Sequence, residues 1–432
     1  MHTEWSRPVP ARMTVNTSPI AASYIDVDLR QVIYALSDAL DLVGIDDVAH
    51  GKRVGIMAAA CARVMGLDRG DTTFLFDLGL LHDIGVSSTR THNHLVSEFD
   101  WQMSQEHCNV GCELLRDFGP LAAMAEPVHY HHTHWQDLQG RADVSRQVAE
   151  QANLIFLVDR VDALTAPYYS SGNVLMQAPA IRQKIRDSAG TFFAPELVEA
   201  FLQASAAEAF WLRLEPRGIQ SALEDMLAQG QPCRASLAQL KQLAGIFSRI
   251  VDAKSPFTAE HSLGVARLAR HLAEAMGVPQ ANCERLEIAG LLHDLGKLRV
   301  PDEVLDKPGQ LDERERKMIN AHSFETYQIL HRIRGFEEIA AWASYHHEEP
   351  DGSGYPFHLT VDAMSREARI LRVADIFQAM AQDRPYRAGL SADAVLQFLQ
   401  ELAHQGRIDA EVVAVAARDM AAAMRAARPA AA

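Results

Sequence analysis

The sequence lacks any apolar run of the roughly 18–20 residues that a membrane-spanning helix needs. Its first eight residues have no apolar core of the kind that a secretory signal carries. The five cysteines are odd in number and form no CxxC pair, which argues against a disulfide framework and against a zinc ribbon. These absences predict a cytoplasmic protein with reduced thiols and no membrane contact.

The chain also lacks an excess of basic residues. Its 432 residues include 41 Lys and Arg against 56 Asp and Glu, which gives a formal net charge of −15. Nucleic-acid polymers and anionic membranes carry charge of the same sign, so neither is expected as a partner. A small anionic substrate stays compatible if cations inside a site bind it. The hydrophobic fraction of 48% excludes wholesale disorder.

Apolar residues recur with helical spacing along most of the chain. In the carboxy-terminal half, Val265 and Leu268 begin one apolar face of a predicted helix that Gly277 ends. In the amino-terminal half the same pattern starts at Val54 and ends at Gly66. We therefore predict an all-α protein without a parallel sheet.

Polar residues recur in the same order in the two halves. His50 and His261 lie 211 residues apart, and the other pairs are separated by 211, 215 or 216 residues. These pairs are His82-Asp83 with His293-Asp294, His107 with His322, His131-His132 with His346-His347, and Asp159 with Asp375. The period is too long for a solenoid, so it indicates an internal duplication that gives two tandem helical domains.

Breaks in the helical pattern set the expected domain boundaries. Pro216 and Gly218 interrupt it, and Gly230 and Pro232 interrupt it again around a short helix. We predict a flexible amino terminus over 1–25, a first domain over 26–215, a linker over 216–235, a second domain over 236–424 and a frayed tail over 425–432.

The repeated residues are of the types that bind divalent first-row metals. Imidazole and carboxylate suit iron, manganese and zinc. A carboxylate such as Asp294 can bridge two cations while the neighbouring His293 binds one of them. A two-metal site lowers the pKa of a bridging water and clamps the oxygens of an in-line displacement at phosphorus, which suits phosphoester hydrolysis. A single histidine is usually structural, so the prediction depends on the ordered set and on its repetition.

Three motifs in the second half resemble those of the HD-GYP family, a branch of the HD-domain metal-dependent phosphohydrolases. The first is His293-Asp294-Leu295-Gly296-Lys297. The second runs from His346 to Pro356 and matches the HHExxDGxGYP signature without a gap. The third is Asp383-Arg384-Pro385-Tyr386-Arg387. The resemblance covers roughly residues 236–424, and the motifs on which it depends are long and specific.

The resemblance implies a cyclic di-GMP phosphodiesterase that releases linear pGpG or GMP with iron or manganese as cofactor. It implies that Lys297 contacts the scissile phosphate, that Arg384 and Arg387 bind phosphate oxygens, and that Tyr355 lies beside the substrate. Phe257 stands where some members carry the glutamate of a third metal, so we expect two metal ions. The implied metal ligands are His261, His293, Asp294, His322, His346, His347 and Asp375.

The first half resembles a degenerate HD domain. Val86 replaces the lysine, the GYP signature is absent, and no Arg-Pro-Tyr-Arg stretch follows Asp159. We therefore expect a regulatory or structural domain, with an independent phosphohydrolase as the alternative. Its residues that would form a second metal site are His50, His82, Asp83, His107, His131, His132 and Asp159.

The residues leave other functions open for the chain as a whole. The substrate could be another cyclic dinucleotide such as 3′,3′-cGAMP, or a nucleotide. Alternatively, the protein could bind a cyclic dinucleotide or dock a partner without hydrolysing anything. Apolar helix faces such as the one beginning at Leu237 could pair two subunits or bind a signalling protein, although burial within the chain explains them equally well.

Overall fold

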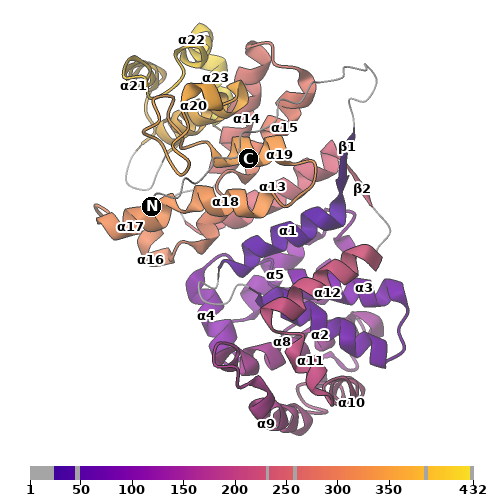
Figure 1. The fold of residues 1–432 in the computed structure, drawn as a ribbon. Helices are drawn as coiled ribbons and strands as arrows, with labels where there is room; N and C mark the ends of the chain where they lie inside the picture. Colours follow the sequence, from indigo (N-terminus) through magenta and orange to yellow (C-terminus); the bar gives the residue numbers. More distant parts are fainter. Residues whose placement is uncertain (1–23, 44–48, 230–232, 256–259, 384–387, 429–432) are drawn as a thin grey trace, which may run out of the picture.

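The chain folds into two helical bodies, one above the other in Figure 1. The computed structural model describes residues 24–43, 49–229, 233–255, 260–383 and 388–428. Almost all regular structure in these ranges is helical, which confirms the all-α prediction. The exception is a two-stranded antiparallel sheet, in which β1 (Tyr24–Asp28) pairs with β2 (Arg234–Ser236).

The first body contains the helices of the amino-terminal half. The apolar face predicted from Val54 is buried, and Gly66 ends its helix with a φ of 72°, a left-handed conformation that glycine adopts without strain. The elements are α1 (Leu29–Asp41), α2 (His50–Val64), α3 (Arg69–Leu81), α4 (Thr89–Ser97), α5 (Gln105–Leu115), η1 (Ala122–Met124), α6 (Ala125–Tyr130), α7 (Trp135–Leu138), α8 (Arg146–Tyr169), α9 (Val174–Asp187), α10 (Pro195–Ala204), α11 (Glu208–Leu212) and α12 (Pro216–Gln229).

The second body repeats this layout around a buried central helix, α14. Val265 and Leu268 are fully buried on its apolar face, which packs against α15 and α20. The elements are α13 (Leu237–Ala253), α14 (His261–Ala275), α15 (Gln280–Leu292), η2 (Leu295–Arg299), α16 (Asp302–Leu305), α17 (Glu313–Asn320), α18 (His322–Leu330), α19 (Glu337–Ser344), η3 (Val361–Ala363), α20 (Arg366–Ala381), α21 (Ala392–His404), α22 (Ala410–Arg418) and α23 (Met420–Ala427).

Two helices lie near the predicted boundaries, and one of them contacts both bodies. The predicted linker contains α12, which packs on α2 of the first body. Helix α1 contacts α2 and α3, and it also contacts α18 and η2 of the second body. The domain limits that the sequence suggests therefore stay proposals, with α1 shared between the two bodies.

A buried ion pair also connects the two bodies. The side chain of Lys254 is fully buried, and its Nζ lies 3.0 Å from Asp302 Oδ1 and 3.2 Å from the Thr89 hydroxyl. Asp302 accepts hydrogen bonds from the Ser88 hydroxyl at 2.7 Å and from the backbone N–H of Thr89 at 3.2 Å. A carboxylate of the second body thus caps the amino terminus of α4 in the first.

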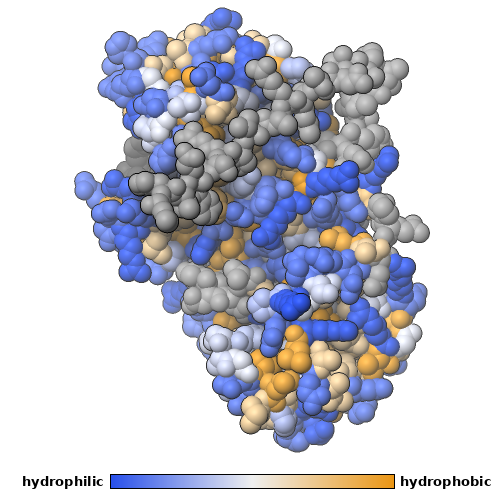
Figure 2. Space-filling model, in the orientation of Figure 1, coloured by the Kyte–Doolittle hydropathy of each residue, from blue (hydrophilic) through white to orange (hydrophobic). Residues whose placement is uncertain are grey.

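The face drawn in Figure 2 is largely hydrophilic, with hydrophobic side chains gathered mainly over the lower part of the first body. Among the described residues, no helix combines the length and the apolar character that crossing a membrane requires.

Candidate metal centres

Five segments bring the seven predicted ligands of the second body together. His261 begins α14, His293 and Asp294 follow α15, and Asp375 lies in α20. The other three ligands are His322 at the start of α18 and His346 and His347 directly after α19. Helix α15 ends at Leu292, so the backbone turns at Asp294 and both neighbours can face the same space. We call these seven residues the second centre.

The carboxylate of Asp294 divides the second centre into two halves. Its Oδ2 lies 3.6 Å from His261 Nε2 and 3.3 Å from His293 Nε2, and Asp375 Oδ1 lies 3.3 Å from His261 Nε2. Its Oδ1 lies 3.4 Å from His322 Nε2 on the other side. Each oxygen of one carboxylate therefore faces a different set of imidazole nitrogens, which is the arrangement of a bridging ligand.

The second half of this centre is completed by the paired histidines. His346 Nε2 lies 3.1 Å from His322 Nε2 and 3.8 Å from Asp294 Oδ1. His322, His346 and His347 each offer one ligand atom, and these three atoms lie within 4.8 Å of one another. The spacing of these nitrogens is close enough for them to share one cation.

The residues fit a divalent metal. The Nδ1 atoms of His293, His322 and His346 donate to backbone carbonyl oxygens at 2.6–2.8 Å, which leaves each Nε2 facing the centre. Asp294 Oδ1 and His293 Nε2 are buried without a hydrogen-bond partner. Buried polar atoms are normally paired, so unpaired acceptors that converge on one point indicate a place for a cation.

The electrostatics of the centre point the same way. Burial lowers the pKa of His322 to about 4 and holds the pKa of His347 well below its usual range, so both imidazoles are neutral, the form in which imidazole binds a metal. Burial alone would raise the pKa of Asp294, but the charges of His293 and Lys297 hold it well below normal. Burial likewise opposes a charge on His293, yet the charges of Asp294 and Asp375 raise its pKa to about 9. A positive charge is thus favoured between these carboxylates.

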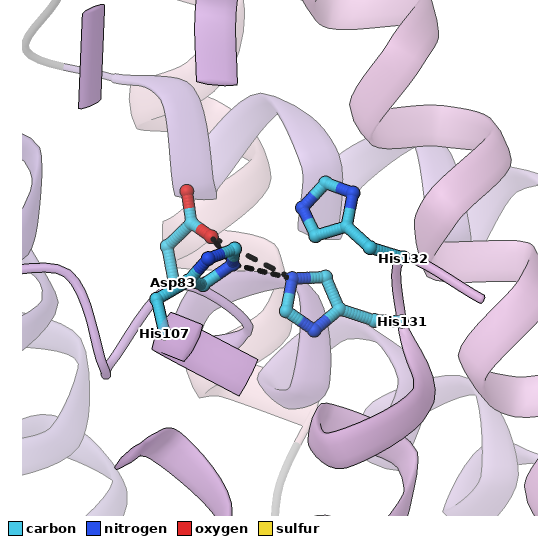
Figure 3. A group of neighbouring side chains, drawn as sticks. All are labelled: Asp83, His107, His131 and His132. Carbon is cyan, nitrogen blue, oxygen red and sulfur yellow. Dashed lines mark hydrogen bonds and ion pairs between the residues drawn. The ribbon is translucent and has the colours of Figure 1, made fainter. Parts of the chain in front are cut away.

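The first body holds an equivalent cluster, the first centre. Figure 3 shows the Asp83 carboxylate, His107, His131 and His132 turned toward one another. Asp83 Oδ1 lies 3.2 Å from His107 Nε2 and 3.6 Å from His131 Nε2. His107 and His131 approach within 3.2 Å through their Nε2 atoms. Each of these four residues offers one ligand atom, and the four atoms lie within 4.8 Å of one another, as in the second body.

The other half of the first centre also mirrors the second. Asp83 Oδ2 lies 3.7 Å from His50 Nε2 and 3.5 Å from His82 Nε2. Asp159 Oδ1 lies 3.4 Å from His50 Nε2. The seven candidate ligands of the first domain are therefore brought together as well, and Asp83 occupies the bridging position of Asp294.

Two of the predicted substrate-binding residues, Lys297 and Tyr355, lie at the second centre. Lys297 Nζ is 2.5 Å from Asp294 Oδ2, and the Tyr355 ring stacks on His347 at a centroid distance of 4.8 Å. In the first domain Val86 takes the place of the lysine and is buried. Arg384 and Arg387, together with Phe257, lie outside the described residues, so their predicted roles stay predictions.

Sequence reasoning missed the residues that support the ligands. Gln378 accepts a hydrogen bond from His261 Nδ1 at 2.5 Å, and Asp252 binds the Ser262 hydroxyl at 2.8 Å. Gln378 could have been found, because it lies one helical turn after Asp375 on the same face. Asp252 could have been found as well, because Asp41 lies 211 residues before it, at the same offset that separates His50 from His261.

A buried glutamate holds the loop that carries Tyr355. Glu348 is fully buried, and its two carboxylate oxygens accept the backbone N–H groups of Phe357 at 2.6 Å and Leu359 at 2.8 Å. The neighbouring Glu349 pairs with Arg372 at 2.7 Å and with Arg407 at 2.8 Å. Both carboxylates of the predicted signature thus fix the loop rather than face the metal ligands.

We expect Glu348→Ala to loosen this loop. Two backbone N–H groups would lose their acceptor, at a cost of roughly 2–4 kcal/mol in the free energy of unfolding. Urea unfolding followed by circular dichroism measures this change. Glu348→Gln keeps one carbonyl acceptor, so it should lose less stability, and equal stability of Glu348→Ala and the wild type would contradict the assignment.

Comparisons with known proteins agree with the geometry. Residues 48–166 and residues 245–412 each match the HD domain family. The chain is 37% identical over 400 residues to a 3′3′-cGAMP-specific phosphodiesterase 1 of Vibrio cholerae, and the match covers 91% of this chain and 92% of that protein. It is 36% identical over 163 residues to a cyclic di-GMP phosphodiesterase response regulator of Xanthomonas campestris, covering 37% of this chain and 43% of that one.

A solved structure repeats the two-body arrangement. The crystal structure of a cyclic GMP-AMP-specific phosphodiesterase of V. cholerae superposes with a TM-score of 0.62 at 26% identity. The match covers 92% of this chain and 98% of that one. Both halves of the chain, and not the second alone, are therefore shared with these two V. cholerae proteins.

Proposed function

The chain belongs to the HD-domain family, with two HD domains in tandem, and we propose from this that its second domain hydrolyses 3′3′-cGAMP. Membership in this group supports metal-dependent hydrolysis of a cyclic dinucleotide as the general activity. The sequence favoured cyclic di-GMP and kept 3′,3′-cGAMP as the alternative. The relative that matches about nine-tenths of the chain, across both domains, is specific for 3′3′-cGAMP and so favours the alternative.

The substrate assignment rests on how much of the chain each relative covers. The cyclic di-GMP phosphodiesterase of X. campestris matches only 37% of the chain, whereas the V. cholerae protein specific for 3′3′-cGAMP matches 91%. Both substrates are cyclic dinucleotides with two phosphodiester bonds, so the same centre can serve either. The choice between them then depends on contacts with the bases.

The residues of the second centre have separable roles in this reaction. Its seven side chains would hold two divalent ions, which when bound supply Lewis acidity toward phosphoryl oxygens and acidify a water. Lys297 places its ammonium group 2.5 Å from Asp294 Oδ2, and the family resemblance implies that this group contacts the scissile phosphate. This ammonium can neutralise charge on a leaving oxygen. The aromatic ring of Tyr355, stacked on His347, offers a surface beside the substrate.

The metal identity is part of the proposal. Imidazole and carboxylate donors suit iron, manganese and zinc, and we propose iron or manganese. We propose two ions in each centre rather than three, because each cluster divides into two halves, one pair about Asp294 and one about Asp83.

A cytoplasmic location and pairing with a second subunit or a signalling protein also belong to the proposal. The described cysteines are unpaired, which suits a reducing compartment.

We expect manganese-loaded full-length protein to prefer 3′3′-cGAMP. The value of kcat/KM for 3′3′-cGAMP should exceed that for cyclic di-GMP by about tenfold, since the wrong base leaves a buried polar group unpaired at a cost of about 1–3 kcal/mol. Separation of linear products by chromatography measures both rates. Bis(p-nitrophenyl) phosphate serves as the control, because its hydrolysis needs the centre without base recognition.

Three results would overturn parts of the proposal separately. A reversed preference would assign the enzyme to cyclic di-GMP. Hydrolysis of bis(p-nitrophenyl) phosphate without turnover of either dinucleotide would retain the metal centre and reject the substrate class. Tight binding of 3′3′-cGAMP with no product in the presence of iron or manganese would make the protein a binding module.

A further inference from the structure

The two centres have matching ligands but different supporting residues. The ligand His50 corresponds to His261, and both present Nε2 to the half that contains the bridging Oδ2. Behind His50, the Nδ1 atom bonds Asp162 Oδ2 at 2.8 Å. Behind His261, the Nδ1 atom donates to the neutral amide of Gln378. A carboxylate acceptor makes the imidazole a stronger donor to a metal than an amide does.

The acceptor carboxylate in the first body is itself fixed. Asp162 is fully buried, and Arg53 binds it through Nε at 2.6 Å and Nη2 at 3.0 Å. The Tyr169 hydroxyl donates to it at 2.7 Å, and the Arg53 guanidinium lies over the Tyr169 ring at 4.3 Å. In the second body the position of Arg53 is taken by Gly264, which has no side chain to hold the residue behind His261.

A second difference concerns the bridging carboxylate. Lys297 Nζ lies 2.5 Å from Asp294 Oδ2, the same oxygen that faces His261 and His293. A cation in this half must share that oxygen with the ammonium group. Val86 stands at the equivalent position in the first body, and in the described ranges no lysine or arginine is paired with Asp83.

A third difference concerns the terminal carboxylate. Arg160 is buried and binds Asp159 Oδ2 through Nη2 at 2.8 Å, which leaves Oδ1 aimed at His50 and His82. The corresponding position in the second body is Ile376, which cannot donate a hydrogen bond. Asp159 is therefore preset for one-oxygen ligation. The formal charges of the two centres are similar, so the difference lies in orientation and donor strength rather than in net charge.

We propose that the first centre is a metal-retaining centre, in which the Asp162–Arg53 network behind His50 holds the ion of this half more tightly than the second centre holds its own. The inference rests on metal binding at both centres and does not depend on which dinucleotide is hydrolysed. It divides the duplicated sites into a structural one with a firmly held ion and a catalytic one with an exchangeable ion.

Chelator titration of the full-length manganese protein tests the proposal. Metal per chain, measured by mass spectrometry after buffer exchange, should fall in two steps separated by about tenfold or more in chelator concentration. The phosphodiesterase activity should disappear with the first step. Asp83→Asn removes the bridging ligand of the first centre, so the resistant step should be missing in that variant.

Two further variants connect the resistance to the network. Asp162→Asn gives His50 the same kind of acceptor as His261 and should move the resistant step toward the labile one. Gln378→Glu places a carboxylate behind His261 and should make the labile step more resistant, which tests the idea even if Asp162→Asn fails to fold. A single step in the wild type, or a resistant step that persists in Asp83→Asn, would overturn the proposal. A protein that binds no metal at all would overturn the metal centres themselves.

Discussion

Asp294→Asn is expected to lower the hydrolysis of 3′3′-cGAMP by about 10³-fold or more, because the loss removes several kcal/mol of charge stabilisation from both halves of the second centre. Asp294 is the one side chain whose two oxygens face both halves, at 3.3 Å from His293 and 3.4 Å from His322. An amide offers one weaker acceptor in place of two. Steady-state assays with linear product detection measure the loss.

The control for this substitution is an exposed carboxylate in the same domain. Asp393 lies exposed in the first turn of α21, far in sequence from the ligands. Asp393→Asn should keep activity within about twofold, since an exposed first-turn carboxylate contributes only a few tenths of a kcal/mol to its helix. Substantial turnover by Asp294→Asn with the metal content unchanged would reject the second centre as the site of chemistry.

Gly296→Ala is expected to have the largest structural effect. A Cβ added at Gly296 would lie 2.1 Å from the backbone oxygen of His322 and 2.8 Å from Glu325 Cβ. The backbone of His322, a proposed metal ligand, must therefore move. We expect a loss of about 1–3 kcal/mol in the free energy of unfolding and a fall in activity of about 10²-fold, because a displacement near 1 Å disturbs the reacting geometry.

Gly245→Ala supplies the matched control. Gly245 lies within α13, and a Cβ added there meets no atom within 4 Å. That variant should be as stable as the wild type or gain about 0.5–1 kcal/mol, since alanine favours a helix interior over glycine. Urea unfolding and metal content distinguish the two variants. Equal stability of Gly296→Ala and Gly245→Ala would show that the approach to His322 is not tight.

The duplication made the two clusters of histidine and aspartate side chains predictable from sequence. Constant offsets paired His50 with His261 and Asp83 with Asp294 before any geometry was known, because only a shared fold preserves the order of polar residues at such spacing. The apolar faces beginning at Val54 and Val265 likewise indicated buried helices. Each of these features is either a local pattern or an internal repeat, and one sequence is enough to show both.

The repeat alone could not predict the residues that lie behind His50 and His261. Asp162 and Gln378 differ in charge, so the repeat itself hides that they play the same part behind a ligand. The hydrogen bonds of Lys254 and Asp302 to Thr89 and Ser88 join segments of two bodies, and nothing in the sequence around these residues marks them. The preference among cyclic dinucleotides also lies beyond the motifs, since the ligands and Lys297 serve any phosphodiester.

The buried ion pair at the junction bears on how the gene can be divided. A fragment that begins at residue 236 would retain Lys254 and Asp302 but lose the Ser88 and Thr89 groups that complete their hydrogen bonding. It would also expose the surfaces of α18 and η2 that α1 covers. Although the two halves arose as copies, each has become part of the other's folding unit, so exchanging either half for that of a distant paralogue should give chimaeras that express poorly.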